Sequence, residues 1–332
     1  MSVLSHSGTI GRMHAITATA AGGPEVLTWT EAPDPRPGSG DLLVRVHAAG
    51  VNFIDTYRRS GVYPMPFPHV PGSEGSGTVV ESRSELFSAG DRVAWFAAPG
   101  SYAEYAVVPA AEALAVPAGI DLATAAALPL QGLTAHYLIR STHPVGAGTT
   151  LLLTAGAGGV GQLAIQLAKA RGATVITTVG SREKAVLARE AGADHVLVTA
   201  ETPDLARAVR DIVPGGVDVS YDGIGRDTFE ATLASLRPRG LQVLFGGASG
   251  QVPPFDLQRL NAMGSLYVTR PSLSAYVATR EELDLRAGEL FAMVADGSLR
   301  VRVGRTLPLA EARAAHEELE GRTTTGKVLL SA

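Results

Sequence analysis

The chain has 332 residues, of which 45% are hydrophobic and 18% are charged, so it is long enough to bury a large core and to form two domains. The 28 basic and 32 acidic residues give a net charge of −4, and no basic excess is available to gather the phosphates of a nucleic acid. Cysteine is absent, which excludes disulfides, thiolate zinc sites and cysteine nucleophiles. The composition is compatible with a cytoplasmic protein, and we expect no nucleic-acid partner.

The first twelve residues, MSVLSHSGTIGR, are polar and lack the basic start and apolar stretch of a signal peptide. We interpret residues 1–12 as either a flexible tail or an expression remnant ahead of a natural start at Met13. The longest uncharged run, residues 144–168, is long enough to tempt a membrane assignment. It is rich in glycine and changes midway from a strand pattern to helical spacing, so we expect no membrane partner.

From Met13 to about Pro117 the chain shows short apolar or alternating runs separated by glycine, proline and aspartate. This pattern is typical of β-strands joined by turns, and the runs are LLVRVHAAGV, GTVVESRS, DRVAWFA and YAEYAVVP. Asp121 is a suitable N-cap for a helix over LATAAAL. After an interruption at Pro129, a second helix is predicted over residues 131–140.

From Thr149 the pattern changes to an alternation of strands and helices. The predicted strands are TLLLTA, ATVITTV, HVLV, VDVSYD and LQVLFG. Between them, helices are predicted over residues 159–171, 181–191, 204–212 and 228–236. Alternation at this spacing indicates an α/β fold with a doubly wound parallel sheet of Rossmann type. After about Leu266 two further helical stretches and a terminal strand, GKVLLSA, complete the chain.

A glycine pattern stands between the first of these strands and the helix that follows it. Gly156, Gly158 and Gly161 fit G-x-G-x-x-G, in which the first glycine allows a tight turn, the second lets the backbone approach a pyrophosphate and the third lets the helix pack closely on the strand. The N–H groups of Gly159 and Val160 are then expected to point at the phosphates, assisted by the helix dipole. Glycine-rich turns also occur for packing alone, but the strand–turn–helix context favours a dinucleotide site.

The end of the next strand indicates which dinucleotide the site prefers. An NAD site usually carries an acidic residue there, whereas this strand ends in Gly180, Ser181 and Arg182, with Lys184 one turn into the helix. A hydroxyl and two cations suit the 2′-phosphate of NADPH, which a carboxylate would repel. We interpret Glu183 as a carboxylate favoured by the helix N-terminus, and a solvated helix face is the alternative explanation of the two cations. The sequence therefore predicts NADPH as the cofactor.

Several segments resemble the medium-chain dehydrogenase/reductase superfamily. They are GVNFIDTYRRSGVYP, PGSEGSGTV, GDRV, GSYAEY, AAALPLQGLTAHY and AGAGGVGQLAIQLAK. YDGIGRDTFEATLASLRPRGLQVLFG and GSLYVTRPSL are similar to the quinone oxidoreductase, or zeta-crystallin-like, branch, and the resemblance spans roughly residues 13–330. It implies a GroES-like, β-rich catalytic domain over residues 13–127 and 267–332, and a Rossmann cofactor domain over residues 128–266.

The resemblance also points to a site without metal. Zinc-dependent members place a cysteine where Asn52 stands and a histidine where Ser73 stands, and the eight histidines show no ligand spacing. Hydride removal from an alcohol needs a Lewis acid because an alkoxide must form, whereas a quinone or conjugated carbonyl accepts hydride with its oxygen only hydrogen-bonded. We therefore predict that the partner is a small-molecule electrophile of this kind and that the hydride is transferred without zinc.

By resemblance, Asn52, Asp55, Tyr57 and Tyr63 are expected to line a cleft between the domains near the nicotinamide. Asn52 is expected to orient cofactor and acceptor, and the tyrosines to hydrogen-bond or stack on a flat ring, with simple packing of the cleft wall as the alternative. Solvent can protonate the product, so proximity of the two rings is the main catalytic contribution. The further cofactor contacts that the resemblance implies are Gln131, Thr134, Thr199, Phe245, Gly246, Val268, Arg270, Arg322 and Lys327.

Two residues depart from the pattern of close relatives. Gln131 stands at a position of lysine, and Thr199 stands where a tyrosine often packs by the adenine ribose and 2′-phosphate. The second departure weakens the NADPH prediction without reversing it. The strand-like segments QVLFGG and GSLYVTRPS imply a homodimer, because such strands extend the sheet between subunits in this superfamily.

The leading prediction is thus an NADPH-dependent quinone reductase. An NADPH-dependent reductase of enones, enals or enoyl thioesters is the first alternative, because it needs the same hydride geometry with a different pocket. A substrate attached to a thioester carrier would favour a path of basic residues that leads to the cleft. The nearby candidate, Arg58 and Arg59 in YRRSG, is better interpreted as a solvated loop. A structural or RNA-binding protein that binds NADPH is the alternative from a different class, and the net charge argues against RNA.

Overall fold

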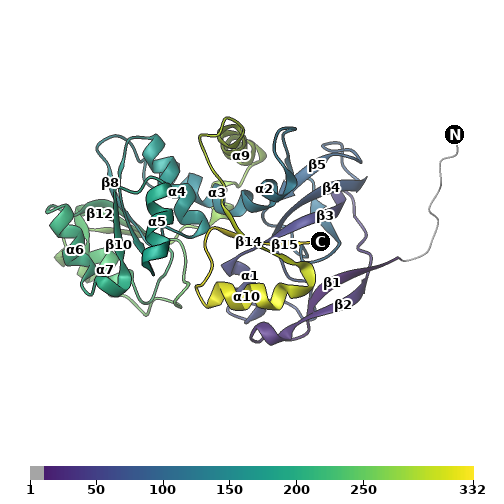
Figure 1. The fold of residues 1–332 in the computed structure, drawn as a ribbon, viewed down its shortest axis with the longest axis horizontal. Coiled ribbons are helices and arrows are strands. Elements are labelled where there is room, and N and C mark those ends of the chain that lie inside the picture. The colour runs from purple at the N-terminus through teal and green to yellow at the C-terminus, as the bar shows by residue number, and fades with distance from the viewer. Residues whose placement is uncertain (1–10) are drawn as a thin grey trace. The chain divides into compact units, whose positions relative to one another are not determined.

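The computed structural model describes residues 11–332, which form two compact units (Figure 1). The second unit begins at Gln131, within a helix that starts at Pro129. The boundary after the parallel sheet falls at Arg302, whereas the sequence analysis drew it at residue 267. Unit 1 consists of residues 11–130, Val303–Thr324 and Val328–Ala332, and unit 2 consists of Gln131–Arg302 and Thr325–Lys327.

Unit 1 is β-rich, as the turn-separated apolar runs predict. Its main sheet has the order β14-β15-β3-β4-β5-β7, with β6 also paired to β3, and β1 and β2 form a separate antiparallel hairpin. Residues 1–10 of the predicted tail lie outside the described residues, and Arg12 already belongs to β1. The elements are β1 (Arg12–Ala18), β2 (Leu27–Pro33), β3 (Asp41–Val51), α1 (Phe53–Arg59), β4 (Glu74–Ser82), β5 (Arg92–Trp95), β6 (Tyr105–Pro109), β7 (Leu114–Ala115), α2 (Leu122–Ala127), β14 (Val303–Pro308), α10 (Ala312–Glu320) and β15 (Lys327–Ser331).

Two apolar clusters stabilise unit 1. Alternate residues of β3 point into a cluster that includes Val44, Val93 and Trp95, because successive side chains of a strand face opposite sides of the sheet. A second cluster brings Tyr102 and the C-terminal Leu309 against the β1–β2 hairpin. Helices α1 and α10 lie side by side (Figure 1). The C-terminal segment is therefore part of the same core as the first helix.

Unit 2 is built on a parallel sheet in the order β10-β9-β8-β11-β12-β13. This is the strand order of a dinucleotide-binding Rossmann sheet. Successive strands are added on one side from β8 to β10 and on the other side from β11 to β13, and all strands are parallel. Figure 1 shows α4 and α5 on one side of this sheet and α6 and α7 on the other. The elements are α3 (Pro129–Tyr137), β8 (Thr150–Leu153), α4 (Gly159–Ala170), β9 (Thr174–Val179), α5 (Arg182–Glu190), β10 (His195–Val198), α6 (Leu205–Ile212), β11 (Val217–Asp222), α7 (Phe229–Ala234), β12 (Leu236–Leu244), α8 (Gln258–Ala262), β13 (Tyr267–Thr269) and α9 (Arg280–Ala295).

Local chemistry explains where three of these helices begin. Asp121, Ser181 and Asp204 each accept a backbone N–H from the first turn of the following helix, so the predicted cap at Asp121 is confirmed. The predicted helix over residues 228–236 is too long, because α7 ends at Ala234 and Leu236 already pairs in β12. A register shift in β12 absorbs the extra residues, which made this strand look shorter in the sequence.

Candidate functional site

The glycine loop of unit 2 joins β8 to α4, as the sequence predicts. The residue in the left-handed backbone region is Ala155, with φ of 57°, and not a glycine. Gly156 is required for a different reason, because a Cβ at this position would overlap the side chain of buried Thr177 on β9. The expectation that Gly156 provides the tight turn is therefore corrected to a requirement for close packing between neighbouring strands.

The other two glycines have distinct roles. A Cβ at Gly161 would overlap the carbonyl oxygen of Ala155, so this glycine lets α4 approach the loop. A Cβ at Gly158 would meet only one protein atom, the same carbonyl at 3.2 Å, and its other sides are open. Gly158 caps a helix of twelve residues, whose first N–H groups at Gly159 and Val160 have no partner within the helix. This arrangement suits the approach of a phosphate to the backbone.

The C-terminal return of the chain lies beside the glycine loop within unit 2. Gly326 donates its N–H to the carbonyl of Ala157 and forms an isolated bridge with Gly158, and Lys327, which follows, is fully buried. A shallow surface depression borders the start of α4. Gln131 and Gly159 were predicted from the sequence; of the residues that were missed, two belong to α4 and three come from segments distant in sequence. The lining residues are Gln131, Gly159, Gln162, Leu163, Val301, Arg302 and Gly326.

The predicted 2′-phosphate residues gather where β9 and β10 end. These strands are parallel neighbours in which Val198 is opposite Val179, and Thr199 donates its hydroxyl to the carbonyl of Val179 at 3.1 Å. Ser181 accepts the backbone N–H of Lys184 at 3.3 Å and so caps α5. The strand order therefore brings Gly180, Ser181, Lys184 and Thr199 to one edge of the sheet.

Sequence reasoning missed a carboxylate at this edge. Arg182 Nε lies 2.6 Å from Glu201 Oε1, and both side chains are exposed, Arg182 by 80%. Glu201 comes from the short turn after β10, so only the pairing of β9 with β10 reveals it. Hydrogen bonding to Ser181 lowers the pKa of Glu183, which agrees with its interpretation as a carboxylate favoured by the start of a helix.

Three of the remaining predicted cofactor residues of unit 2 follow other strands of the same sheet. Phe245 and Gly246 come directly after β12 and both donate N–H groups to the carbonyl of Asp222 at the end of β11. Val268 lies in β13, Arg270 follows it, and Thr134 lies in α3. Carboxyl ends of parallel strands meet at one edge, so Phe245, Gly246 and Arg270 lie along the edge where such sheets bind ligands. Arg322 instead follows α10 in unit 1.

Asn52 and Asp55 of unit 1 form a buried polar cluster at the start of α1. The Asn52 amide donates to Glu74 Oε2 at 2.8 Å and to the carbonyl of Gly50 at 3.2 Å. The Asp55 carboxylate accepts the backbone N–H of Asn52 at 2.9 Å and the hydroxyl of Ser73 at 2.8 Å. The two positions that carry metal ligands in zinc relatives, Asn52 and Ser73, are thus engaged in hydrogen bonds. Within residues 11–332, no group of three or more histidine, cysteine or acidic side chains could hold a metal ion.

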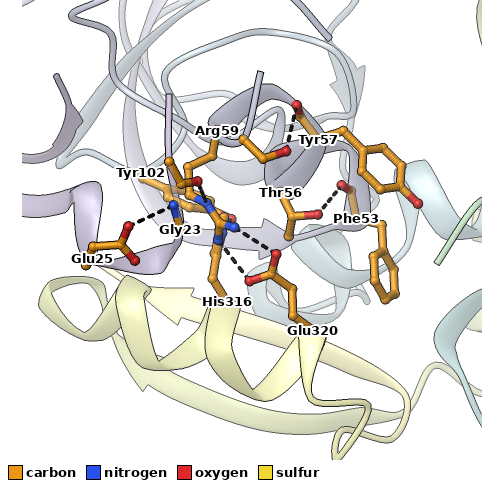
Figure 2. A network of polar contacts seen from close by, with 11 residues as sticks. Gly23, Glu25, Phe53, Thr56, Tyr57, Arg59, Tyr102, His316 and Glu320 are labelled. Carbon is orange, nitrogen blue, oxygen red and sulfur yellow. Dashed lines mark hydrogen bonds and ion pairs between the residues drawn. The ribbon is translucent and has the colours of Figure 1, made fainter. Parts of the chain in front are cut away.

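Tyr57 and Tyr63 form an aromatic pair in unit 1. Their ring centroids are 5.6 Å apart at an interplanar angle of 78°, and Tyr63 is 37% exposed. Phe53 also lies near Tyr57, with ring centroids 6.2 Å apart. Figure 2 shows the Tyr57 ring directed away from the polar network around Arg59. The pair therefore offers aromatic surface and hydroxyl groups outside that network.

The interpretation of YRRSG as a solvated loop is wrong for Arg59. Its side chain is only 2% exposed and pairs with Glu320 of α10 at 2.7 Å (Figure 2). Arg59 also contacts His316 Nδ1 at 3.0 Å, and Arg58 donates to Ser73 at 2.6 Å. Both arginines lie on α1, and no sequence signal connects them to a helix that follows more than 250 residues later.

His316 gives the stability of the protein a specific pH dependence. Burial, assisted by the charge of Arg59, lowers the pKa of His316 from 6.5 to about 3. The unfolded chain therefore binds this proton first, and we expect the free energy of unfolding to fall as the pH drops below about 6.5. The slope from this one proton approaches about 1.4 kcal/mol per pH unit.

This dependence can be isolated by comparison with His316→Gln, which does not titrate. Urea unfolding of both proteins at several pH values between 7 and 4 would give the difference in their stabilities, on the order of 1 kcal/mol lost per unit. Acidic groups and His136 are common to both proteins and cancel in the difference. A constant difference across this range would show that His316 binds its proton equally in the folded and the unfolded protein.

Comparisons with known proteins agree with this architecture. Residues 38–118 match the alcohol dehydrogenase GroES-like domain, and residues 159–284 match the zinc-binding dehydrogenase family. The quinone oxidoreductase of Pseudomonas aeruginosa is 45% identical over 320 residues, which cover 95% of this chain and 98% of the relative. The 2-haloacrylate reductase of a Burkholderia species is 41% identical over 321 residues, covering 93% and 96%.

Solved structures of quinone oxidoreductases share this fold. The quinone oxidoreductase of Escherichia coli in complex with NADPH has a TM-score of 0.92 and 43% identity, covering 97% of this chain and 99% of that one. A mycobacterial protein in complex with NADPH has a TM-score of 0.94 and 49% identity, covering 96% and 100%. A GroES-like unit combined with a Rossmann-type unit defines a medium-chain dehydrogenase/reductase. Within that class, the chain belongs to the quinone oxidoreductase family.

Proposed function

We propose that this chain is an NADPH-dependent quinone reductase that transfers hydride from the nicotinamide to a quinone-type acceptor without zinc. The observation that carries the proposal is the Rossmann sheet of unit 2, whose glycine loop is open at Gly158 and whose β9 is followed by Gly180 and Ser181 and not by an acidic residue. Relatives named quinone oxidoreductase, two of them from Pseudomonas aeruginosa and Escherichia coli, support the choice of acceptor.

The residues of unit 2 fit a bound dinucleotide. The open side of Gly158 leaves the space that a Cβ would take, and the N–H groups of Gly159 and Val160 would hold the pyrophosphate. Ser181 and Lys184 would hold the 2′-phosphate, and Arg182 could join them by leaving Glu201. When bound, NADPH supplies the hydride, and with one proton from solvent a quinone becomes a hydroquinone while NADP⁺ is released.

The acceptor side of the proposal rests on unit 1. Both N–H groups of the Asn52 amide already donate to protein oxygens, so Asn52 cannot donate to a quinone oxygen without breaking one of these bonds. We therefore assign Asn52 to orientation through its fixed position. The hydroxyl groups of Tyr57 and Tyr63 are the donors assigned to the acceptor, and their rings offer flat surfaces for stacking.

A substitution at Ser181 tests the cofactor assignment without disturbing the fold. Aspartate is as good an N-cap as serine, so Ser181→Asp should keep α5 and the stability of unit 2. The added carboxylate should repel the 2′-phosphate and accept hydrogen bonds from ribose hydroxyls. We expect the dissociation constant for NADPH to rise about 10- to 100-fold, a loss of about 1.4 to 3 kcal/mol, while that for NADH stays equal or falls.

Ser181→Asn is the matched control, because asparagine also caps helices but carries no charge. It should change the NADPH constant far less than Ser181→Asp does. Fluorescence titration of each variant with NADPH and NADH gives both constants. Equal losses in the two variants, or an NADH preference in the unaltered protein, would refute the assignment of this edge to the 2′-phosphate.

A reductase of activated double bonds is the second candidate. The specific observation in its favour is the 41% identity to a 2-haloacrylate reductase across nearly the whole chain. Such a substrate accepts hydride at carbon in conjugation with a carbonyl, so the hydride donor side of the site is the same. Enones, enals and enoyl thioesters belong to this class, and only the acceptor surface distinguishes them from quinones.

One assay separates these functions. NADPH oxidation would be followed by absorbance with phenanthrenequinone, benzoquinone and an aliphatic enone, each repeated with NADH and with a metal chelator. Quinone turnover that prefers NADPH and is insensitive to chelator is the expected result. Turnover of the enone alone would assign double-bond reduction, and tight NADPH binding without any turnover would support the structural or RNA-binding alternative.

We further propose a cytoplasmic homodimer. β13 is the edge strand of the unit 2 sheet, and its Tyr267 is 62% exposed, so a second copy could extend the sheet there. Light scattering of the full chain and of Tyr267→Asp tests this assembly, which predicts a dimer that the charged variant weakens. No helix within the described part of the chain is long and apolar enough to span a membrane. Cell fractionation tests the location.

A further inference from the structure

A continuous row of buried hydrogen bonds connects the start of α1 to α10 within unit 1. The Tyr102 hydroxyl lies 3.2 Å from Asp55 Oδ2 and 3.1 Å from His316 Nε2, and His316 Nδ1 lies 3.0 Å from Arg59 Nη1. Asp55 in turn accepts the backbone N–H of Asn52. None of these five residues is more than 5% exposed. Figure 2 shows Arg59, His316 and Glu320 converging on this region from two helices.

The chemistry of Arg59 sets the direction of every bond in this row. A guanidinium can only donate, so His316 Nδ1 must accept and the imidazole proton must be on Nε2. The Nε2–H group then donates to the Tyr102 oxygen, which leaves the Tyr102 hydrogen for Asp55. Burial raises the pKa of Tyr102 and lowers that of His316, which keeps both side chains neutral. A single arrangement of hydrogens therefore satisfies the row.

This row is suited to holding groups in place and not to conducting protons. It ends at Arg59, which does not release a proton in proteins, so no proton can enter from that end. Buried polar groups also cost desolvation energy, and replacing them with apolar packing is often neutral or stabilising. Stability alone thus gives little reason for the row, whereas precise placement of Asp55 gives one.

Asp55 connects the row to the residues assigned to the acceptor. Its carboxylate accepts the N–H of Asn52 and the hydroxyl of Ser73, so it fixes the residue that begins α1. Tyr57 lies within the same helix, half a turn further on. A shift of Asp55 would therefore move both Asn52 and the ring of Tyr57.

We propose that Tyr102 and His316 are positioning residues of the reductase, which fix the Asp55 carboxylate and through it hold Asn52 and Tyr57 in the geometry needed for hydride acceptance. This inference rests on the proposed function, because it assigns the acceptor to Asn52 and Tyr57. Neither Tyr102 nor His316 touches the acceptor in this assignment. Their effect on the reaction should pass entirely through Asp55.

The first test is Tyr102→Phe, which keeps the ring and removes only the bridging hydroxyl. We expect kcat for a quinone to fall about tenfold while the dissociation constant for NADPH, set by unit 2, stays within about twofold. Tyr221→Phe is the matched control. Tyr221 is also fully buried and donates to the carbonyl of Leu138 at 2.7 Å, but it lies in unit 2 outside the row. Loss of the Tyr221 hydroxyl should leave kcat unchanged, even where Tm falls as much as it does in Tyr102→Phe.

Two further readouts distinguish positioning from general structural support. His316→Gln offers one oxygen to Arg59 and one N–H to Tyr102, so it should retain most of the activity that His316→Leu loses. Adding Tyr102→Phe to Asp55→Asn should reduce kcat little further, because residues that act through one group are not additive. If Tyr102 and Asp55 contributed independently, their fold losses in kcat would multiply in the double variant.

The outcomes separate the inference from the function on which it rests. If the unaltered protein reduces a quinone or enone and Tyr102→Phe leaves kcat unchanged, the positioning role is refuted and the proposed function stands. An activity loss that merely follows Tm, as judged against Tyr221→Phe, or a multiplicative double variant, also refutes it. Absence of turnover in the unaltered protein with every acceptor overturns the proposed function and the inference together.

Discussion

Gly161→Ala should disrupt both the folding and the cofactor binding of unit 2. The new methyl group would overlap the Ala155 carbonyl, which is backbone and cannot move without displacing the whole loop. Overpacking of this kind costs about 1 to 3 kcal/mol, and displacement of the first turn of α4 would remove the N–H groups assigned to the pyrophosphate. We expect a clear fall in the urea midpoint together with an NADPH dissociation constant raised on the order of 100-fold.

Gly158→Ala separates these two effects. Its Cβ would meet only one protein atom, at 3.2 Å, so the loss of stability should be about 1 kcal/mol or less. NADPH binding should still weaken about 10- to 100-fold, because the methyl group occupies the side from which the phosphate approaches. Gly146→Ala, with open space around its Cβ position, is the neutral control. Unchanged NADPH affinity in Gly158→Ala would contradict the placement of the pyrophosphate.

Glu320→Ala should strongly destabilise unit 1. The variant leaves the guanidinium of Arg59, whose side chain is 2% exposed, without the carboxylate that now lies 2.7 Å away. Removing one partner from a buried charge typically costs about 3 to 5 kcal/mol, and partial access of water at Glu320 places the expected loss near about 3 kcal/mol. Equilibrium unfolding in urea, at a constant m value, measures it.

Glu317→Ala on the same helix is the matched control. Its carboxylate pairs with Arg313 at 2.9 Å, one turn away, and both side chains are at least half exposed. Such a pair contributes only about 0.3 to 0.5 kcal/mol. Adding Arg59→Met to Glu320→Ala should recover part of the lost stability, because it removes the stranded charge. Similar small losses in Glu320→Ala and Glu317→Ala would show that Arg59 finds another anion or water.

The sequence alone determined the class of fold, and it located the loop before α4 and the end of β9, where the cofactor is proposed to bind. Strand–helix alternation is a local pattern, and it predicted the parallel sheet that unit 2 contains. Glycine spacing marked the loop before α4, although the left-handed residue there proved to be Ala155. Asp121 was readable as a cap because capping depends on residues three positions apart.

Tertiary structure decided what depends on residues distant in sequence. Arg59 reads as a solvated cation in YRRSG, yet it is buried because α10 places Glu320 and His316 against α1. Glu201 became visible beside Arg182 only when β10 paired with β9. A charge in the sequence carries no information about its burial or its partner, since both are set by which segments pack together. The chain therefore specifies its cofactor fold locally, while packing between distant helices fixes the residues that hold Asn52 in place.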